Sequence, residues 1–460
     1  MDKFNLILDT DQYKSSHFLQ YPPNTTGLVA YLESRTGLYD KTVFFGLQYI
    51  LKKYLTKPIT IEDVKEASSF FKLHGLPFNE EGWMDIAKDL KGKIPLRIYA
   101  VAEGTVVPIR NILMRVESTD PRFFWVVGWF EAMLLRVWYP ITVTTQSFFI
   151  KKLIYESLKK TSDDPDREVL FKLHDFGARG VSSAESASIG GAAHLVNFTG
   201  SDTILGLLCA RDYYSAKMTP SSIPAAEHSM MMVWGKDYEE DAFRHIFSEL
   251  AKRGSLIAIP SDTFNMDHAI SDIWANRLKD LVTSSGKILV VRTDSGDSKT
   301  VVLSALKVLE KAYGVTTNKK GYKVLQHVRV IHSDSVTSET VKEVLQTITK
   351  ANYSTTNVVF GMGGALLQQI NRDTMGFAYK VCLATVSGKN MPVSKSTDSS
   401  PLKHSRGGYL DLTKTQKGYE TIVRPDNKPG KDSQLQLVFE NGELLIDENL
   451  DTIRKRASVA

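Results

Sequence analysis

The sequence predicts an α/β protein: an irregular (β/α) barrel joined to a second, mixed α+β domain built from the N- and C-terminal segments. One observation is a repeated pattern between Leu173 and Gly364, where short apolar runs end at polar or glycine clusters and helical stretches follow. Another is the change of composition after about Lys380, toward a polar segment and a terminal hairpin. Parallel strands returned by helices produce the first pattern. We therefore place the barrel-like domain at 161–380 and the mixed domain at 1–160 plus 381–460.

The strands and helices of the barrel-like domain are predicted from periodicity. The runs 288–291, 328–331 and 358–360 are short and rich in β-branched residues, which favours strands. Between them, apolar residues recur every three or four positions over 302–309 and 341–348, which indicates helices that bury one face. Strands that alternate with helices in this way form a parallel sheet.

The mixed domain is predicted from shorter elements. The expected elements are a helix over 42–54, antiparallel strands over 96–101, 106–107 and 112–116, an aromatic-rich helical stretch over 123–138, a linker over 161–166, a polar loop over 394–408, and a hairpin made by 435–439 and the turn 440–442. The C-terminal hairpin is expected to join the N-terminal part of the chain.

Composition narrows the class of protein. The chain has 460 residues, of which 42% are hydrophobic and 24% charged, as in soluble globular proteins. The net charge of +5 is mild, and no long basic block calls for a nucleic-acid partner. The apolar run 4–8 is too short for a signal peptide, and Glu131 interrupts the most apolar stretch, 123–135. With two cysteines only, we expect a cytoplasmic protein without membrane contact.

Polar and glycine clusters stand at the expected carboxyl ends of the strands, where parallel α/β folds bind their ligands. The clusters are 174–177, 197–202, 224–229, 260–262, 292–296, 332–335 and 361–364. The sequence therefore predicts an enzyme whose candidate site is distributed over these clusters.

Two clusters suit a phosphate group. Gly363 and Gly364 open a helical stretch, where backbone N–H groups and the helix N-terminus favour an anion, and Arg372 is a further phosphate partner. Plain turns give glycine clusters about as often. The hydroxyl and carboxylate of Ser333 and Asp334 have two interpretations, a phosphate contact or a helix N-cap.

Two other clusters carry charged groups with open roles. Arg292 and Asp294 suit a ribose or a carbonyl, and a plain salt bridge explains them equally well. His228, next to Glu227, is a candidate nucleophile or base, although a structural histidine is the commoner case. No histidine pair or Cys-x-x-Cys has the spacing of a zinc site, so no metal site is directly predicted. Mg²⁺ is expected only in company with phosphates.

An aromatic residue and a carboxylate complete the candidates. Phe176 could stack on a flat ring while Arg179 meets an anion, and a core phenylalanine is the alternative. Asp202 could accept a hydrogen bond from a ligand N–H group or cap the next helix. From the residues alone we expect a barrel enzyme that handles a phosphorylated sugar. Transfer at a sugar carbon, phosphate hydrolysis and sugar-phosphate isomerisation all remain open.

An ordered set of motifs resembles one family over nearly the whole chain. The motifs are 10–14 (TDQYK), 20–24 (QYPPN), 43–50 (VFFGLQYI), 138–142 (WYPIT), 172–183 (KLHDFGARGVSS) and 224–229 (PAAEHS). Together they resemble the nicotinamide phosphoribosyltransferases, which are type II phosphoribosyltransferases.

The resemblance implies a homodimer with shared active sites. It implies transfer of the phosphoribosyl group of 5-phosphoribosyl 1-pyrophosphate (PRPP) to nicotinamide in NAD salvage, giving nicotinamide mononucleotide and pyrophosphate. The implied substrate-binding residues are Asp11, Tyr13, Arg35, Phe176, Arg179, Asp202, Arg292, Ser333, Asp334, Gly363, Gly364, Arg372, Lys380 and Lys395. By analogy the ring lies between Phe176 and Tyr13 of the partner subunit. Asp202 would accept from the carboxamide and would repel nicotinate.

The other implied residues surround the phosphates. Arg179, with Arg35, Lys380 and Lys395 of the partner subunit, would neutralise the Mg²⁺-bound pyrophosphate. Asp294 would hold the ribose. Ser333, Asp334, Gly363, Gly364 and Arg372 would line the 5′-phosphate end. The implied catalytic residues are His228, Asp294, Glu227 and Asn265, and ATP is the expected activating co-substrate that phosphorylates His228.

Three departures from the family pattern stand out. Asn265 occupies the position of a carboxylate expected to orient His228, so weaker ATP coupling is expected. Ser333-Asp334-Ser335 replaces a usual Gly-Asp-Gly, and Met362 and Ala365 stand within the glycine cluster. The nearest rival function is nicotinate phosphoribosyl transfer, which Asp202 argues against. A non-catalytic signalling or binding role is the rival from another class.

Overall fold

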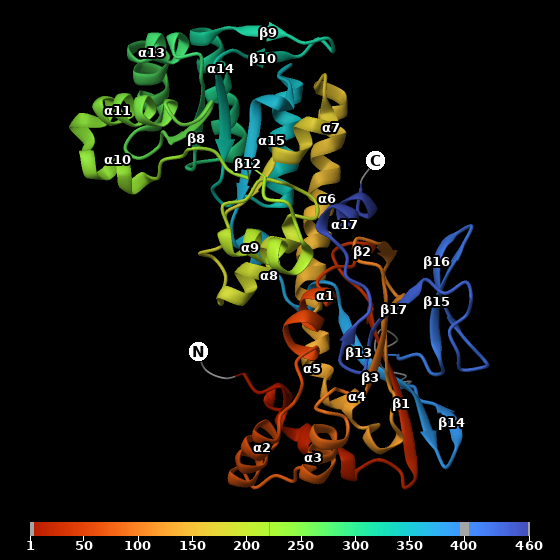
Figure 1. The fold of residues 1–460 in the computed structure, drawn as a ribbon. Helices are drawn as coiled ribbons and strands as arrows, with labels where there is room; N and C mark the ends of the chain where they lie inside the picture. The colour runs from red at the N-terminus through yellow and green to blue at the C-terminus, as the bar shows by residue number, and fades with distance from the viewer. Residues whose placement is uncertain (1–3, 220, 396–403, 459–460) are drawn as a thin grey trace. The chain divides into compact units, whose positions relative to one another are not determined.

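The computed structural model describes residues 4–219, 221–395 and 404–458. These residues form two compact units (Figure 1): the first comprises 4–145, 211–216 and the described part of 370–458, and the second comprises 146–210 and the described part of 217–369. The first two changes of unit fall within α6 (Trp138–Thr161) and at the end of α9 (Ile204–Tyr214). The boundaries predicted at 160/161 and 380/381 lie farther along the chain. The expected linker 161–166 is the turn between α6 and α7 (Pro165–Glu168), inside the second unit.

A five-stranded parallel sheet forms the centre of the second unit. Its order is β6 (Leu173–Asp175), β12 (Val358–Met362), β11 (Val328–His332), β8 (Ile288–Thr293) and β7 (Leu256–Pro260). Single parallel bridges extend both edges, from Asp175 to Ser201 and from Ala225 to Ala258. The sheet is open, so the barrel is incomplete, and the predicted α/β class is confirmed.

The helices that follow β8 and β11 explain why the strands return in parallel. Helix α14 (Ser298–Tyr313) buries Val302 and Leu306, and α15 (Ser338–Lys350) buries Val341 and Leu345. Their N-termini are capped by the side chains of Asp297 and Thr337. Figure 1 shows both helices alongside the strands. The helices predicted over 302–309 and 341–348 are confirmed.

Shorter elements complete the second unit. They are η5 (Val169–Phe171), α8 (Ala184–His194), α10 (His228–Trp234), η6 (Lys236–Tyr238), α11 (Glu239–Ala251), α12 (Met266–His268), η7 (Ala269–Arg277), α13 (Lys279–Ser284), the strand pair β9 (Val315–Thr317) and β10 (Lys323–Leu325), η8 (Thr355–Asn357) and α16 (Gly364–Leu367).

The first unit is built on a mixed α+β arrangement with a seven-stranded sheet. The strand order is β14 (Lys389–Pro392), β13 (Phe377–Val386), β1 (Thr25–Ser34), β5 (Ile112–Ser118), β3 (Leu96–Val101), β17 (Leu435–Glu440) and β18 (Glu443–Leu444). Neighbouring strands pair antiparallel throughout. Because β17 pairs with β3, the C-terminal hairpin joins the N-terminal segment, as predicted.

Helices and two strand pairs surround this sheet. They are η1 (Leu6–Leu8), η2 (Gln12–Leu19), α1 (Leu47–Ile50), η3 (Leu51–Leu55), α2 (Ile61–Leu73), α3 (Glu80–Asp89), η4 (Pro121–Phe123), α4 (Val126–Trp129), α5 (Glu131–Leu135), η9 (Arg372–Thr374) and α17 (Leu450–Arg456), with β2 (Lys41–Val43) paired to β4 (Val106–Pro108) and β15 (Leu410–Thr415) paired to β16 (Gly418–Val423).

Two predicted elements of this unit differ from the structure. The helix expected over 42–54 begins only at Leu47, because β2 takes up the preceding residues and Gly46 turns the chain at a φ of 101°. The stretch 123–138 is split into short helices before α6 begins. Of the expected loop 394–408, residues 396–403 lie outside the described residues. No described helix combines the length and apolar character needed to cross a membrane.

Candidate active site

The order of the strands brings the predicted clusters to one edge of the parallel sheet. From one side to the other, the strand ends carry 201–202, 175–177, 361–364, 332–335, 292–296, 260–262 and 224–229. Clusters that are far apart in sequence are therefore neighbours in space, and the site can be built from their contacts.

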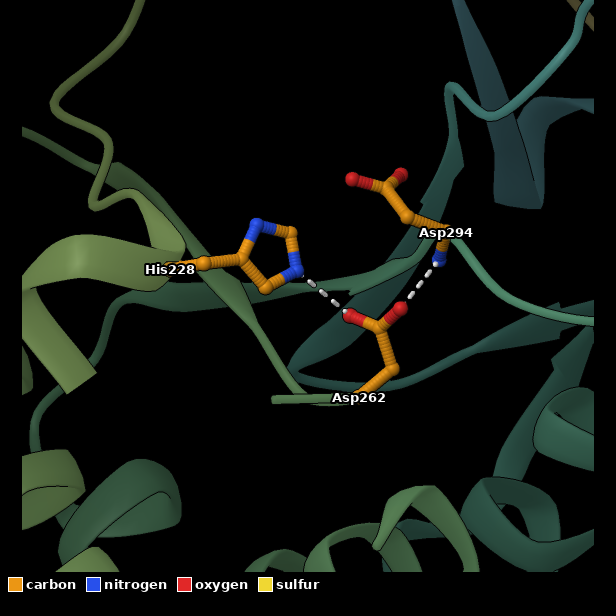
Figure 2. A group of neighbouring side chains, drawn as sticks. All are labelled: His228, Asp262 and Asp294. Carbon is orange, nitrogen blue, oxygen red and sulfur yellow. Dashed lines mark hydrogen bonds and ion pairs between the residues drawn. The ribbon is translucent and has the colours of Figure 1, made fainter. Parts of the chain in front are cut away.

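His228 and Asp262 lie at one end of this edge, beyond strand β7 (Figure 2). His228 is the first residue of α10, and its Nε2 lies 3.0 Å from Oδ1 of Asp262, which follows β7. The Asp262 side chain is 3% exposed and that of His228 is 35% exposed. Because a carboxylate only accepts hydrogen bonds, Nε2 carries the hydrogen, and Nδ1 is the ring nitrogen left for other chemistry.

The second carboxylate oxygen of Asp262 holds the loop after β8. Oδ2 accepts from the backbone N of Asp294 at 3.2 Å and from Oγ of Ser295 at 2.6 Å. Asp262 therefore fixes His228 and the Asp294 backbone at once. The sequence analysis gave no role to Asp262, although its place directly after a strand, like that of Asp294, was a signal.

The expected role of Asn265 is corrected by the structure. Its Oδ1 accepts from the backbone N of His268 at 3.0 Å, which caps α12. The residue that orients His228 is Asp262 instead. The reason is local: an amide three residues before a free helical N–H is an effective N-cap. Glu227 is exposed and immediately precedes α10.

Arg292, Asp294 and Ser333 form a closed ring of hydrogen bonds across β8 and β11. Arg292 Nη2 lies 2.6 Å from Asp294 Oδ2, and Arg292 Nε donates to Ser333 Oγ at 3.1 Å. Ser333 Oγ donates to Asp294 Oδ1 at 2.5 Å. The two interpretations of the Arg292–Asp294 pair are thus compatible: it is a salt bridge, and it lies at the strand ends.

The Phe176 ring packs on the sheet beside these groups. It is partly buried against Ala258, Val290 and Ile331. Gly361 lies directly next to it, since a Cβ at that position would be 2.1 Å from Phe176 Cε2 and 2.8 Å from Ser333 Cβ. A glycine is required there, and the ring rests on an apolar base formed by three strands.

Asp175 connects Phe176 with Asp202. The buried Asp175 accepts from Gly177 N through Oδ1 at 2.7 Å, and its backbone O accepts from Asp202 N at 2.9 Å. Burial, with the nearby Asp202 carboxylate, raises the pKa of Asp175 to about 6. The Asp202 side chain is exposed at the edge of the sheet.

The remaining predicted residues of this unit surround an open surface. Arg179 and Asp334 are exposed, and a Cβ at Gly364 would meet no atom within 4 Å. Backbone N–H groups at 363–364 begin α16, as predicted. Ser335 has a φ of 49°, a left-handed conformation that is unfavourable for serine.

The first unit carries its own cationic pocket, of about 410 Å³. Arg35, Arg372 and Lys380 line it, together with Glu131 and Tyr379. Arg372 thus lies in a different unit from Gly363 and Gly364, with which the sequence analysis had grouped it. The other implied residues of this unit are Asp11, Tyr13 and Lys395, which are all exposed.

The side chains at the strand ends are chemically suited to bind phosphate groups together with a metal cation. Within the described residues, ligand atoms of His228, Asp262 and Asp294 all lie within 4.8 Å of one another, so they could share a metal ion. Two carboxylates are a usual protein contribution to a Mg²⁺ site whose other ligands are phosphate and water. Cationic side chains, backbone N–H groups and an aromatic ring supply the other elements of a nucleotide-type site.

Comparison with known proteins agrees with this geometry. The model of the nicotinate phosphoribosyltransferase family matches residues 171–443, and that of the nicotinamide phosphoribosyltransferase N-terminal domain matches residues 5–98. The chain is 46% identical to a nicotinamide phosphoribosyltransferase of Xanthomonas campestris, over 99% of this chain and 98% of that protein. It is 30% identical to one of Acinetobacter baylyi, over 99% and 97%.

Solved structures show the same fold at low identity. A nicotinate-nucleotide pyrophosphorylase from Pyrococcus furiosus aligns with a TM-score of 0.63 at 16% identity, covering 99% of this chain and 97% of that one. Human nicotinic acid phosphoribosyltransferase aligns with a TM-score of 0.55 at 14% identity, covering 97% and 92%. The predicted resemblance is confirmed: the chain belongs to the nicotinate phosphoribosyltransferase family, as a phosphoribosyltransferase related over its whole length to the nicotinamide-using enzymes.

Proposed function

We propose that this enzyme joins nicotinamide to PRPP, giving nicotinamide mononucleotide and pyrophosphate in NAD salvage. The observation that carries the proposal is the end-to-end similarity to curated nicotinamide phosphoribosyltransferases. The site supports it, because an aromatic ring on an apolar base, an exposed carboxylate and a phosphate-type glycine cluster share one sheet edge. The proposed location is the cytoplasm, which the two buried free cysteines, Cys209 and Cys382, support.

Asp202 is the residue proposed to recognise the carboxamide group of nicotinamide. A carboxylate accepts from the N–H₂ group of nicotinamide and repels the carboxylate of nicotinate, so the preference follows from charge. Asp175 supports this role, because its carbonyl holds the Asp202 backbone. Transfer to nicotinate is the second candidate, since the matching family is named for nicotinate.

The proposed mechanism separates binding from activation. Nicotinamide stacks on Phe176, and Asp294 holds the ribose. As the bond between C1′ and pyrophosphate breaks, positive charge develops on the sugar, and nearby carboxylates stabilise it. The pyridine nitrogen of nicotinamide donates its lone pair to C1′, and pyrophosphate leaves with the electrons of the broken bond. Asp262 and Asp294, two of the three residues whose ligand atoms lie within 4.8 Å of one another, would hold Mg²⁺, which would neutralise charge on pyrophosphate.

ATP is the proposed activating co-substrate. With Nε2 bound to Asp262, the lone pair on His228 Nδ1 can attack the γ-phosphorus of ATP. The bond between the γ-phosphorus and the bridging oxygen breaks, and ADP leaves. The imidazolium character of the phosphorylated ring is stabilised by Asp262. Asn265 does not contribute to this step, so the amide at position 265 is no obstacle to it.

A product assay tests the reaction. The protein is incubated with PRPP, Mg²⁺ and either nicotinamide or nicotinate, with and without ATP, and the products are identified. We expect nicotinamide mononucleotide, a clear ATP stimulation, and loss of that stimulation but not of basal transfer in His228→Ala. Asp202→Ala should weaken the amide preference. Equal or faster turnover of nicotinate contradicts the substrate assignment, and an ATP-independent rate contradicts the role of His228.

A homodimer with shared sites is the proposed assembly. Its support is the cationic pocket of the first unit and the exposure of Tyr13, which is 61%. In the proposed dimer, Tyr13, Arg35, Lys380 and Lys395 serve the site of the other subunit. Mixing Arg35→Ala with Asp294→Ala subunits should restore about a quarter of the activity, because half of the dimers are mixed and each then has one intact site. No recovery on subunit exchange indicates a site within one chain.

A further inference from the structure

The Ser333 hydroxyl both accepts and donates in the closed set of hydrogen bonds that it forms with Arg292 and Asp294. A hydroxyl has one hydrogen to donate, and an arginine can only donate. The direction of the bonds is therefore fixed: Arg292 Nε donates to Ser333 Oγ at 3.1 Å, and Ser333 Oγ donates to Asp294 Oδ1 at 2.5 Å. The direct Arg292 Nη2 to Asp294 Oδ2 contact of 2.6 Å closes the ring.

The ring holds the Asp294 carboxylate at both oxygens. One contact alone, from Nη2 to Oδ2, would leave the carboxylate free to rotate about its Cβ–Cγ bond. The second contact reaches Arg292 only through the serine hydroxyl. The side chains of Arg292 and Asp294 are 26% and 14% exposed, so both bonds are partly shielded from water.

Contacts from both neighbouring strands hold His332, the residue before Ser333, and limit the space around Ser333. On the β8 side, His332 Nδ1 lies 2.7 Å from Thr293 O, and its Nε2 lies 2.9 Å from Ser298 Oγ. On the β12 side, Gly361 lies against the Ser333 Cβ. These contacts fix the backbone next to Ser333, and the hydroxyl itself is held by its hydrogen bonds with Arg292 and Asp294.

We propose that Ser333 is a positioning residue, whose hydroxyl orients Arg292 and Asp294 for the ribose of PRPP and does not contact the phosphate. The inference rests on the proposed function and refines it, since the sequence analysis placed Ser333 at the 5′-phosphate. The only hydrogen of the hydroxyl is used on Asp294, so none is left to donate to a phosphate oxygen.

The two roles differ in a double-mutant cycle. The variants are Ser333→Ala, Asp294→Asn and the pair together, and the readouts are PRPP affinity by calorimetry, KM and kcat. We expect Ser333→Ala to lower kcat/KM for PRPP about 10-fold, the usual effect of losing a hydrogen bond to a charged group. In the Asp294→Asn background the same change should lower PRPP affinity less than about 2-fold, because the partner is already altered.

Three controls separate the outcomes. Ser333→Thr keeps the hydroxyl and should restore most of the lost kcat/KM for PRPP. Ser304→Ala, on the exposed face of α14, should change neither PRPP affinity nor kcat/KM. Melting temperatures show whether each variant is folded. Similar losses from Ser333→Ala in both backgrounds mean that the hydroxyl acts on substrate directly, which overturns the proposal, as does no loss in either. Absence of PRPP binding by the unmodified enzyme contradicts the proposed function instead.

Discussion

The absence of a single Cβ atom, at Gly361, allows the Phe176 ring to pack where it does. A Cβ at Gly361 would lie 2.1 Å from Phe176 Cε2 and 2.3 Å from Cδ2, far inside contact distance. A clash with a ring that already packs on Ala258 and Val290 cannot be relieved without moving the ring. The glycine at this strand end is therefore set by its neighbour rather than by backbone conformation.

Gly361→Ala should displace the Phe176 ring. We expect KM for nicotinamide to rise about 10-fold or more, in the range of 1–3 kcal/mol that overpacking costs. Steady-state kinetics with nicotinamide as the varied substrate measure the effect, and a thermal melt reports the accompanying loss of stability. An unchanged KM for nicotinamide would argue that the ring does not bind the substrate.

Ser335 carries backbone strain at the same edge. Its φ of 49° is left-handed, a conformation that glycine adopts without steric strain. Ser335→Gly should raise the free energy of unfolding by about 0.5–1 kcal/mol, since relief of strain exceeds the added entropy of the unfolded glycine. Urea unfolding measures it. Ser335→Ala is the matched control and should show no gain; a gain equal to that of the glycine would exclude strain as the cause.

Among the secondary-structure elements, the short segment between β7 and α12 contains two polar residues with different roles. Asp262 at the strand end binds His228, whereas Asn265 caps the helix. Both residues lie in one short segment, and their side chains serve different elements. The carboxylate beside His228 thus comes from a residue three positions earlier in the chain than expected.

The pair Asp262→Asn and Asn265→Asp tests this division. Asp262→Asn should lower ATP-stimulated turnover at least 10-fold, because an amide stabilises the imidazolium poorly. Asn265→Asp should stay within about 2-fold of the unmodified rate, because aspartate caps helices as well as asparagine does. Turnover with and without ATP is measured for both. The opposite ranking would return the orienting role to position 265.

The first unit contains a buried acid, whereas the predicted catalytic residues belong to the second unit. Glu103 is buried, and its Oε1 accepts from Gln48 N at 2.7 Å. Burial raises the pKa of Glu103 to about 7, against the effect of these hydrogen bonds, and the Glu448 carboxylate raises it further. The folded protein thus favours the protonated form.

The stability of the protein should therefore fall as pH rises. An acid with a raised folded pKa contributes stability below its ordinary pKa of 4.5, and this is lost as pH rises through about 7. Glu103→Gln should match the unmodified protein near pH 5 and exceed it near pH 8, by on the order of 2–3 kcal/mol as an upper bound. Urea unfolding at both pH values decides. A constant difference would mean that Glu103 does not titrate in this range.

Local patterns in the sequence predicted the strands β8, β11 and β12 and the residue clusters at the strand ends. Apolar residues recur every two positions in a strand and every three or four in a helix when one face is buried, and polar clusters follow strand ends. Both patterns can be recognised within a short stretch of sequence. The clusters at 292–296 and 332–335 were identified in this way. The motif set also determined the family.

The contacts among these residues become visible only in the folded chain. It selected Asp262 over Asn265 as the partner of His228, joined Ser333 to Asp294, and placed Arg372 in the first unit. Such contacts depend on the order of strands in the sheet and on the direction of each side chain beyond its strand. Neighbours in the sheet are far apart in the chain, so no local pattern of residues encodes the distance between them.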